Sequence, residues 1–161
     1  MATLNVRTSD DKPSPEQLNI NPHYAYLDID DDTGLALTTP TTATTVGGAP
    51  MTVQAESGLD ADVAGPITVT RAGLYEVDFC ASEITPVNSQ VVTLEVYKGA
   101  VAAGGKQKFT QTGTAVAVPS MSGLSGPITC AVGDILTLKV IASTGNFTIK
   151  RLQIRARQIA D

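Results

Sequence analysis

The sequence predicts an all-β protein, built as an antiparallel β-sandwich. Apolar side chains alternate with polar ones over residues 67–79, at Ile67, Val69, Tyr75, Val77 and Phe79. This period of two is typical of half-buried strands. Residues that favour helices are sparse, while Gly, Pro and Thr are frequent. The chain is 42% hydrophobic but only 4% aromatic, so its core depends on Val, Ile, Leu and Ala, which suit pleated sheets.

Turn signals divide the chain after residue 45 into short strands. We expect strands at residues 51–55, 66–71, 74–84, 90–98, 106–111, 114–119, 126–131, 134–142 and 146–158. Residues 58–65 are expected to form a loop, and turns are expected at 72–73, 86–88, 104–105, 112–113, 123, 133–134 and 144–146. Such closely spaced strands, with no helical segment between them, predict a jelly roll or another sandwich.

The last expected strand changes phase along its length. Phe147 and Ile149 lie on one register, and Leu152 and Ile154 lie on the next. A change of this kind indicates a β-bulge near residues 150–151.

Residues 1–45 differ from the rest, and we expect them to be an extended N-terminal arm outside a sandwich domain of residues 46–161. Prolines interrupt the segment, at Pro13, Pro15 and Pro22 among others, and its apolar runs are too short to form a core alone. Its separated apolar side chains favour an arm that orders against a partner: Leu4, Val6, Leu18, Ile20, Tyr24, Tyr26, Leu27 and Ile29.

Three motifs in the expected sandwich resemble the C1q/TNF-like jelly rolls. ITVTRAGLYEVDFCAS resembles the strand–turn–strand signature of that superfamily, with Gly73 in the turn and Tyr75 as the first inward aromatic. ITCAVGDILTLKV resembles its Gly-Asp hairpin, formed here by Gly133 and Asp134, although Cys130 stands where Leu is usual. TIKRLQIRARQI resembles the final strand. The resemblance covers residues 65–159 and implies a jelly roll that assembles as a homotrimer.

Within this superfamily, the chain looks most like the capsid decoration (cement) proteins of bacteriophages. That resemblance implies a structural virion protein on the capsid surface, made in the host cytoplasm, whose arm binds the major capsid protein. Three identical arms on a trimer would bind much more tightly than one. The alternative is a tail-fibre or baseplate module that recognises a host glycan through residues 100–106 and 112–126.

Composition argues against several other classes of function. The net charge of −5 argues against nucleic-acid binding. No apolar run approaches the roughly 20 residues that span a bilayer, so no membrane partner is expected. The N-terminal residues lack the pattern of a secretory signal, and Cys80 and Cys130 are expected to be reduced thiols, although a disulfide between them stays open.

The segment LDIDDDTG places Asp28, Asp30 and Asp32 on alternate positions and superficially resembles a calcium loop. The spacing is wrong for an EF-hand, so we expect an acidic turn and no metal or other cofactor. His23 is the only histidine and lies far in sequence from both cysteines. Because no catalytic set is evident, we expect a protein that is not an enzyme.

Overall fold

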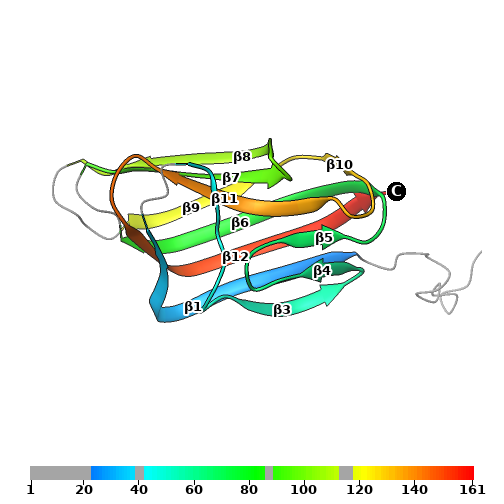
Figure 1. Cartoon of the computed structure of the whole chain (residues 1–161), viewed down its shortest axis with the longest axis horizontal. Coiled ribbons are helices and arrows are strands. Elements are labelled where there is room, and N and C mark those ends of the chain that lie inside the picture. The colour runs from blue at the N-terminus through cyan, green and yellow to red at the C-terminus, as the bar shows by residue number, and fades with distance from the viewer. Residues whose placement is uncertain (1–22, 39–41, 86–88, 113–117) are drawn as a thin grey trace, which may run out of the picture.

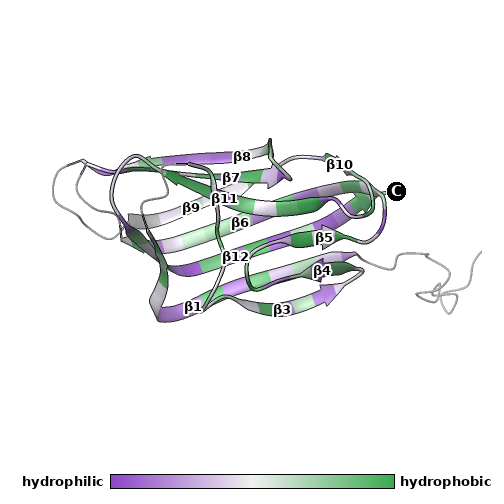
Figure 2. Ribbon diagram, viewed as in Figure 1, coloured by the Kyte–Doolittle hydropathy of each residue, from purple (hydrophilic) through white to green (hydrophobic). Residues whose placement is uncertain are grey.

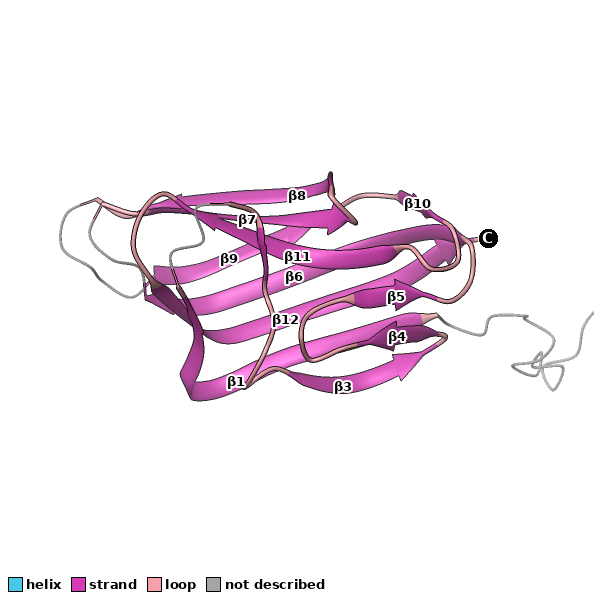
Figure 3. Ribbon diagram, in the orientation of Figure 1, coloured by secondary structure: helices cyan, strands magenta, loops and turns pink. Residues whose placement is uncertain are grey.

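The computed structural model describes residues 23–38, 42–85, 89–112 and 118–161. These residues form twelve strands and no helix, arranged as two facing antiparallel sheets (Figures 1 and 3). The predicted all-β sandwich is therefore confirmed.

The first sheet has the strand order β10-β6-β12-β1-β3, with β9 also paired to β6. Its strands are β10 (Ile128–Cys130), β6 (Gly73–Thr85), β12 (Phe147–Ala160), β1 (Tyr24–Leu37), β3 (Thr52–Ser57) and β9 (Val118–Leu124). The second sheet has the order β4-β5-β11-β7-β8, with β2 paired to β11. Its strands are β4 (Leu59–Ala61), β5 (Ile67–Val69), β11 (Ile135–Ala142), β7 (Val91–Lys98), β8 (Val101–Thr110) and β2 (Thr44–Thr45).

Alternation along the strands fills the space between the sheets with aliphatic side chains. In β6 the side chains of Tyr75, Val77 and Phe79 are buried, and in β11 those of Leu136 and Leu138 are buried. Hydrophilic and hydrophobic segments accordingly alternate along the long strands (Figure 2). The core therefore lies between the sheets and leaves one polar face on each outer side.

Residues 24–37 correct the predicted arm, because they form β1 inside the first sheet. β1 pairs with β12 on one side and with β3 on the other. Leu27 and Ile29 are at most 1% exposed, whereas Tyr24 and Tyr26 lie on the outer face. The predicted boundary at residue 45 is therefore wrong, since the sandwich includes β1.

The predicted arm thus keeps only the part that precedes β1. Its remaining apolar residues lie outside the described residues: Leu4, Val6, Leu18 and Ile20.

The predicted phase change in the last strand is confirmed. Ile149 and Leu152 are both buried although three positions separate them. The paired strand β6 changes phase opposite this point, where Glu83 has a φ of 52°. The register of β1 against β12 also shifts there, between Asp30 and Leu35. The register of β12 against β6 stays continuous from Ile149 to Leu152, so the extra residues lie in β1, between Asp30 and Leu35, and the predicted bulge is not in β12.

Several other strand boundaries in the structure differ from those expected from the sequence. The expected loop at 58–65 contains β4, and the expected turn at 104–105 lies inside β8. β9 covers residues 118–124 where a strand at 114–119 was expected, and residues 113–117 lie outside the described part of the chain. In the two loops that the glycan-binding alternative requires, most of the described residues are therefore strand, at 101–106 and 118–124.

Glycines bring β8 and β9 together where the two sheets meet at one edge. A Cβ atom at Gly123 would lie 2.4 Å from the carbonyl oxygen of Gly105 and 2.7 Å from the ring of Phe79. A Cβ at Gly104 would lie 2.6 Å from the carbonyl oxygen of Ser125. Only residues without a side chain fit this corner, which closes the sandwich.

Candidate binding face

The outer face of the first sheet is the candidate functional site. The registers of β1 and β6 against β12 align their outward side chains in rows that cross the three strands. The rows are Tyr24 with Arg157 and Glu76, Tyr26 with Arg155 and Asp78, Asp28 with Gln153 and Cys80, and Asp30 with Arg151 and Ser82. Residues from three separate parts of the sequence thus form one polar surface.

Arg155 lies at the centre of this face. Its guanidinium carbon is 5.3 Å from the centre of the Tyr26 ring, a cation–π distance. Its Nη2 donates a hydrogen bond to Oε1 of Gln153 at 3.3 Å. Asp78 is opposite Arg155 in the register, yet it forms no ion pair with any described residue. The centre of the face therefore presents a carboxylate that is available to a partner.

The neighbouring row toward the C-terminus of β12 is already paired. Nε of Arg157 donates to Oε1 of Glu76, and Nη2 of Arg157 forms an ion pair with the same oxygen. This two-point contact fixes the planar guanidinium against the carboxylate. The unpaired carboxylate of Asp78 therefore lies in a row next to one whose charges are already paired.

Arg151 pairs with acidic side chains of the predicted acidic turn. Its Nε is 2.9 Å from Oδ1 of Asp30, and its Nη2 is 2.8 Å from Oδ1 of Asp32. Glu83 of β6 lies 3.7 Å from the same guanidinium. The hydrogen bond to Asp32 and the nearby carboxylates raise the pKa of Arg151, so the guanidinium stays charged.

Asp31 holds the turn within this cluster. Its Oδ1 accepts the backbone N–H groups of Thr33 at 2.6 Å and Gly34 at 3.0 Å. The bond from Gly34, and after it the bond from Thr33, holds the pKa of Asp31 below its ordinary value, because both bonds stabilise the charged carboxylate. In the segment that resembles a calcium loop, Asp30 and Asp32 thus pair with Arg151, and Asp31 between them bonds to the backbone.

The three weak metal candidates do not converge on a shared point. Asp30 and Asp32 pair with Arg151, whereas Asp28 lies beside Asp30 on the sheet face. Within the described ranges, no group of three or more His, Cys, Asp or Glu side chains is arranged to hold a metal ion. Burial, and secondarily the charge of Asp30, raises the pKa of Asp28.

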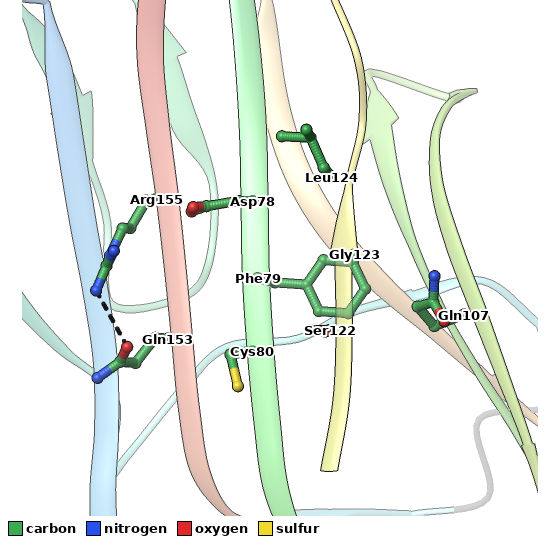
Figure 4. Close-up of a pocket in the computed structure, with 9 residues that line it drawn as sticks. All are labelled: Asp78, Phe79, Cys80, Gln107, Ser122, Gly123, Leu124, Gln153 and Arg155. Carbon is green, nitrogen blue, oxygen red and sulfur yellow. Dashed lines mark hydrogen bonds between the residues drawn. The ribbon is translucent and has the colours of Figure 1, made fainter.

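Two adjoining recesses hollow the face. The larger has a volume of about 490 Å³ and reaches from β12 across β6 and β9 to β8 (Figure 4). Its lining is Asp78, Phe79, Cys80, Gln107, Ser122, Gly123, Leu124, Gln153 and Arg155. The second, about 340 Å³, shares Cys80 and Gln153 with it and extends to Asp28 and Arg151. Carboxylate, amide and guanidinium groups therefore line one shallow depression.

The two cysteines are on opposite sides of the first sheet and are not bonded to each other. Cys80 is exposed on the outer face, as its alternation with Glu76 and Asp78 predicted. Cys130 is buried, also as predicted, and burial, with a smaller effect from Asp134, raises the pKa of its thiol.

The residues of the first superfamily motif have structural roles at one end of the sandwich. Tyr75 is fully buried, and its hydroxyl donates to the carbonyl oxygen of Arg71 at 2.8 Å. Gly73 begins β6, where a Cβ atom would lie 2.6 Å from the carbonyl oxygen of Ala160. The first turn and the end of the last strand are therefore packed against each other.

The Gly-Asp turn lies at the same end, but it joins β10 of the first sheet to β11 of the second, so the expected hairpin between paired strands is not formed here. Gly133 has a φ of 87°, which favours glycine. Oδ2 of Asp134 accepts the N–H of Ala131 at 2.8 Å and lies 3.2 Å from Nζ of Lys98. The bond from Ala131, followed by that from Lys98, lowers the pKa of Asp134.

The sequence predicted which side chains share one side of each strand, but it did not predict that these strands are neighbours. Alternation placed Arg155 and Arg157 on one side of their strand and Glu76 and Asp78 on one side of theirs. Tyr26 and Asp28 were assigned to the arm, so their position beside these residues was missed. The available signal was the alternation of Ala25, Leu27 and Ile29 with polar residues.

Comparison with known proteins identifies relatives by fold. No protein-family model matches the chain, and no curated protein matches it. None of the described residues forms a helix that could span a membrane.

Two solved structures are similar over most of their length. An Eiger TNF from S. frugiperda superposes with a TM-score of 0.57 at 12% identity, covering 88% of this chain and 94% of that one. The PRD1 vertex protein P5 superposes with a TM-score of 0.55 at 16% identity, covering 85% of this chain and 96% of that one. At these identities the likeness concerns the fold. The chain has the C1q/TNF-like jelly-roll fold that its turn and hairpin motifs predicted.

Proposed function

We propose that the protein is a structural component of a phage virion, a homotrimer that binds the assembled capsid and stabilises it. The observation that carries this proposal is the likeness to PRD1 vertex protein P5 over 85% of the chain. The protein acts by binding and not by catalysis. By mass action, a protein that binds only the assembled shell stabilises that state.

The outer face of the first sheet supports self-association. It combines an unpaired carboxylate at Asp78, the guanidinium of Arg155, and the exposed apolar side chains of Tyr24 and Leu124. A closed trimer requires two different complementary surfaces on each subunit. This hollowed face, with groups of both charges, provides one of them.

Residues 1–22 supply the capsid contact in this proposal. The folded strand β1 removes Tyr24, Tyr26, Leu27 and Ile29 from the arm, and Leu4, Val6, Leu18 and Ile20 remain. An extended segment with spaced apolar side chains can add a strand to an exposed sheet edge of the major capsid protein. Three such segments on a trimer raise the overall affinity without further contacts.

The test is co-sedimentation with undecorated capsids of the virus that encodes the chain. The full-length protein is compared with a variant that begins at His23, which keeps β1 and hence the whole sandwich. We expect saturable binding by the full-length protein and loss of binding by the shortened one. Equal thermal melting of the two proteins is the control for folding, and no binding by either would refute the proposal.

The trimer is tested separately by sedimentation equilibrium. We expect a mass three times the 16.7 kDa of one chain. Arg155→Glu places a second negative charge near Asp78 and should reduce that mass. A monomer for the unchanged protein would refute the trimer.

The recess around Asp78 favours one second candidate, a host-glycan receptor-binding module of a tail fibre or baseplate. Planar amide, carboxylate and guanidinium groups such as Gln107, Gln153 and Arg155 suit the hydroxyl groups of sugars. A glycan-binding screen distinguishes the two candidates, because this candidate predicts binding that is retained when residues 1–22 are removed.

A further inference from the structure

Exposed apolar side chains gather at one end of the sandwich. Seven large hydrophobic side chains are exposed among the described residues, and five of them belong to strand ends or turns at this end. The five are Tyr24 (37% exposed), Val101 (70%), Val132 (66%), Ile135 (42%) and Ile159 (43%). We call this set the apolar end.

Strand pairing places these residues together. β1 begins where β12 ends, since Tyr24 is opposite Arg157. β7 ends at Lys98, beside the first residues of both β8 and β11. Val132 lies in the turn between β10 and β11, and β10 pairs with the start of β6. All these strand ends lie on the side that bears the C-terminus (Figure 1).

Two basic side chains at the apolar end are paired within the chain. Nζ of Lys98 is 3.2 Å from Oδ2 of Asp134 and donates to the carbonyl oxygen of Thr129 at 3.0 Å. Arg71 pairs with Asp161 at 2.9 Å. Glu56 and Asp60 flank the β3–β4 turn at Gly58 and form no ion pair with a described residue. The apolar end therefore combines exposed valine and isoleucine side chains with both paired and unpaired charges.

The segment before β1 joins the sandwich at this same end. Nδ1 of His23 is 2.6 Å from the carbonyl oxygen of Gly58, and the carbonyl oxygen of His23 accepts the N–H of Gln158 at 2.8 Å. Leu18 is five residues before His23, and five extended residues span at most about 18 Å. A partner that binds Leu18 or Ile20 is therefore within that distance of the point where β1 begins.

We propose that the apolar end is a docking surface for the same capsid protein that receives residues 1–22. Its partner is an apolar patch beside the site where the arm binds. This inference rests on the proposed capsid-binding function and adds which end of the sandwich faces the shell. An isolated exposed valine needs no explanation, but five of the seven exposed large hydrophobic side chains of the described residues lie at the end of the sandwich where β1 begins.

The experiment uses the full chain with Val101→Ser and Val132→Ser together. Both side chains are mostly exposed, so the free energy of unfolding and the trimer mass should not change. We expect the dissociation constant for undecorated capsids to rise about ten-fold or more, because the lost contacts are apolar. Val63→Ser is the matched control, since Val63 is 45% exposed in the β4–β5 loop, away from this end.

The outcomes separate the two proposals. If the unchanged protein binds capsids and the double variant binds equally well, the apolar end is not a docking surface. An equal loss with Val63→Ser would also refute it. The affinity of the unchanged protein for capsids should vary little between about 50 and 500 mM salt. A steep fall in affinity with salt would mean that the contact is charged and not apolar. If the unchanged protein does not bind, the proposed function itself fails.

Discussion

Gly123→Ala should destabilise the protein through steric overlap alone. The added Cβ atom would lie 2.4 Å from the backbone oxygen of Gly105 and 2.7 Å from two ring carbons of Phe79. Neither neighbour can easily move, since one is backbone and the ring is 3% exposed. Overpacking of this kind costs about 1–3 kcal/mol. For a chain of this length, that predicts a melting temperature about 2–12 °C lower.

Differential scanning calorimetry and urea unfolding measure this effect, and Gly99→Ala supplies the matched control. Gly99 has a φ of 57°, but no atom lies within 4 Å of its added Cβ, so its substitution tests backbone strain without overlap. Gly123 has the reverse properties, overlap without an unusual φ. If the Gly123→Ala protein has the same melting temperature as the unchanged protein, the steric overlap inferred between β8 and β9 would be refuted.

A second substitution tests which neighbour is responsible. Phe79→Leu removes the ring carbons that the new Cβ would meet. In that background, Gly123→Ala should cost less than in the unchanged protein, so the two effects should not add. Additive effects would assign the whole cost to the Gly105 carbonyl oxygen.

The remaining predictions concern three polar groups. Tyr75→Phe removes the hydrogen bond to Arg71 and should lower the free energy of unfolding by about 1–2 kcal/mol, measured in urea; no change would refute a stabilising bond. The folded-state pKa of Asp134 is lowered, chiefly by Ala131, so its stabilisation is present at neutral pH and is lost as pH falls below about 4. When the pH is lowered from about 5 to 3, the melting temperature of the Asp134→Asn protein should therefore fall less than that of the unchanged protein. The folded-state pKa of Asp28 is raised, so its contribution is favourable at low pH and is lost as pH rises through that pKa. Asp28→Asn should melt no lower than the unchanged protein at pH 7, and a clear fall would contradict the raised pKa.

Much of the fold could be predicted from short stretches of sequence. The alternation around Tyr75 defines β6, and the turn at Gly133 and Asp134 defines the connection from β10 to β11. The phase change between Ile149 and Leu152 located the level of the irregularity, although the extra residues lie in the neighbouring strand β1. These features depend on residues close in sequence, where the two-residue period of a strand and the backbone freedom of glycine act directly.

The binding face and the limits of the arm were decided by the tertiary structure. Tyr26 and Asp28 alternate with buried neighbours, but the prolines and aspartates around them made the segment look like an arm. The segment becomes a strand because β12 and β3 supply hydrogen-bonding partners from distant parts of the chain. Alternation in the sequence determines which side of a strand is buried. Only long-range pairing determines which strands are neighbours, and therefore which outward side chains meet.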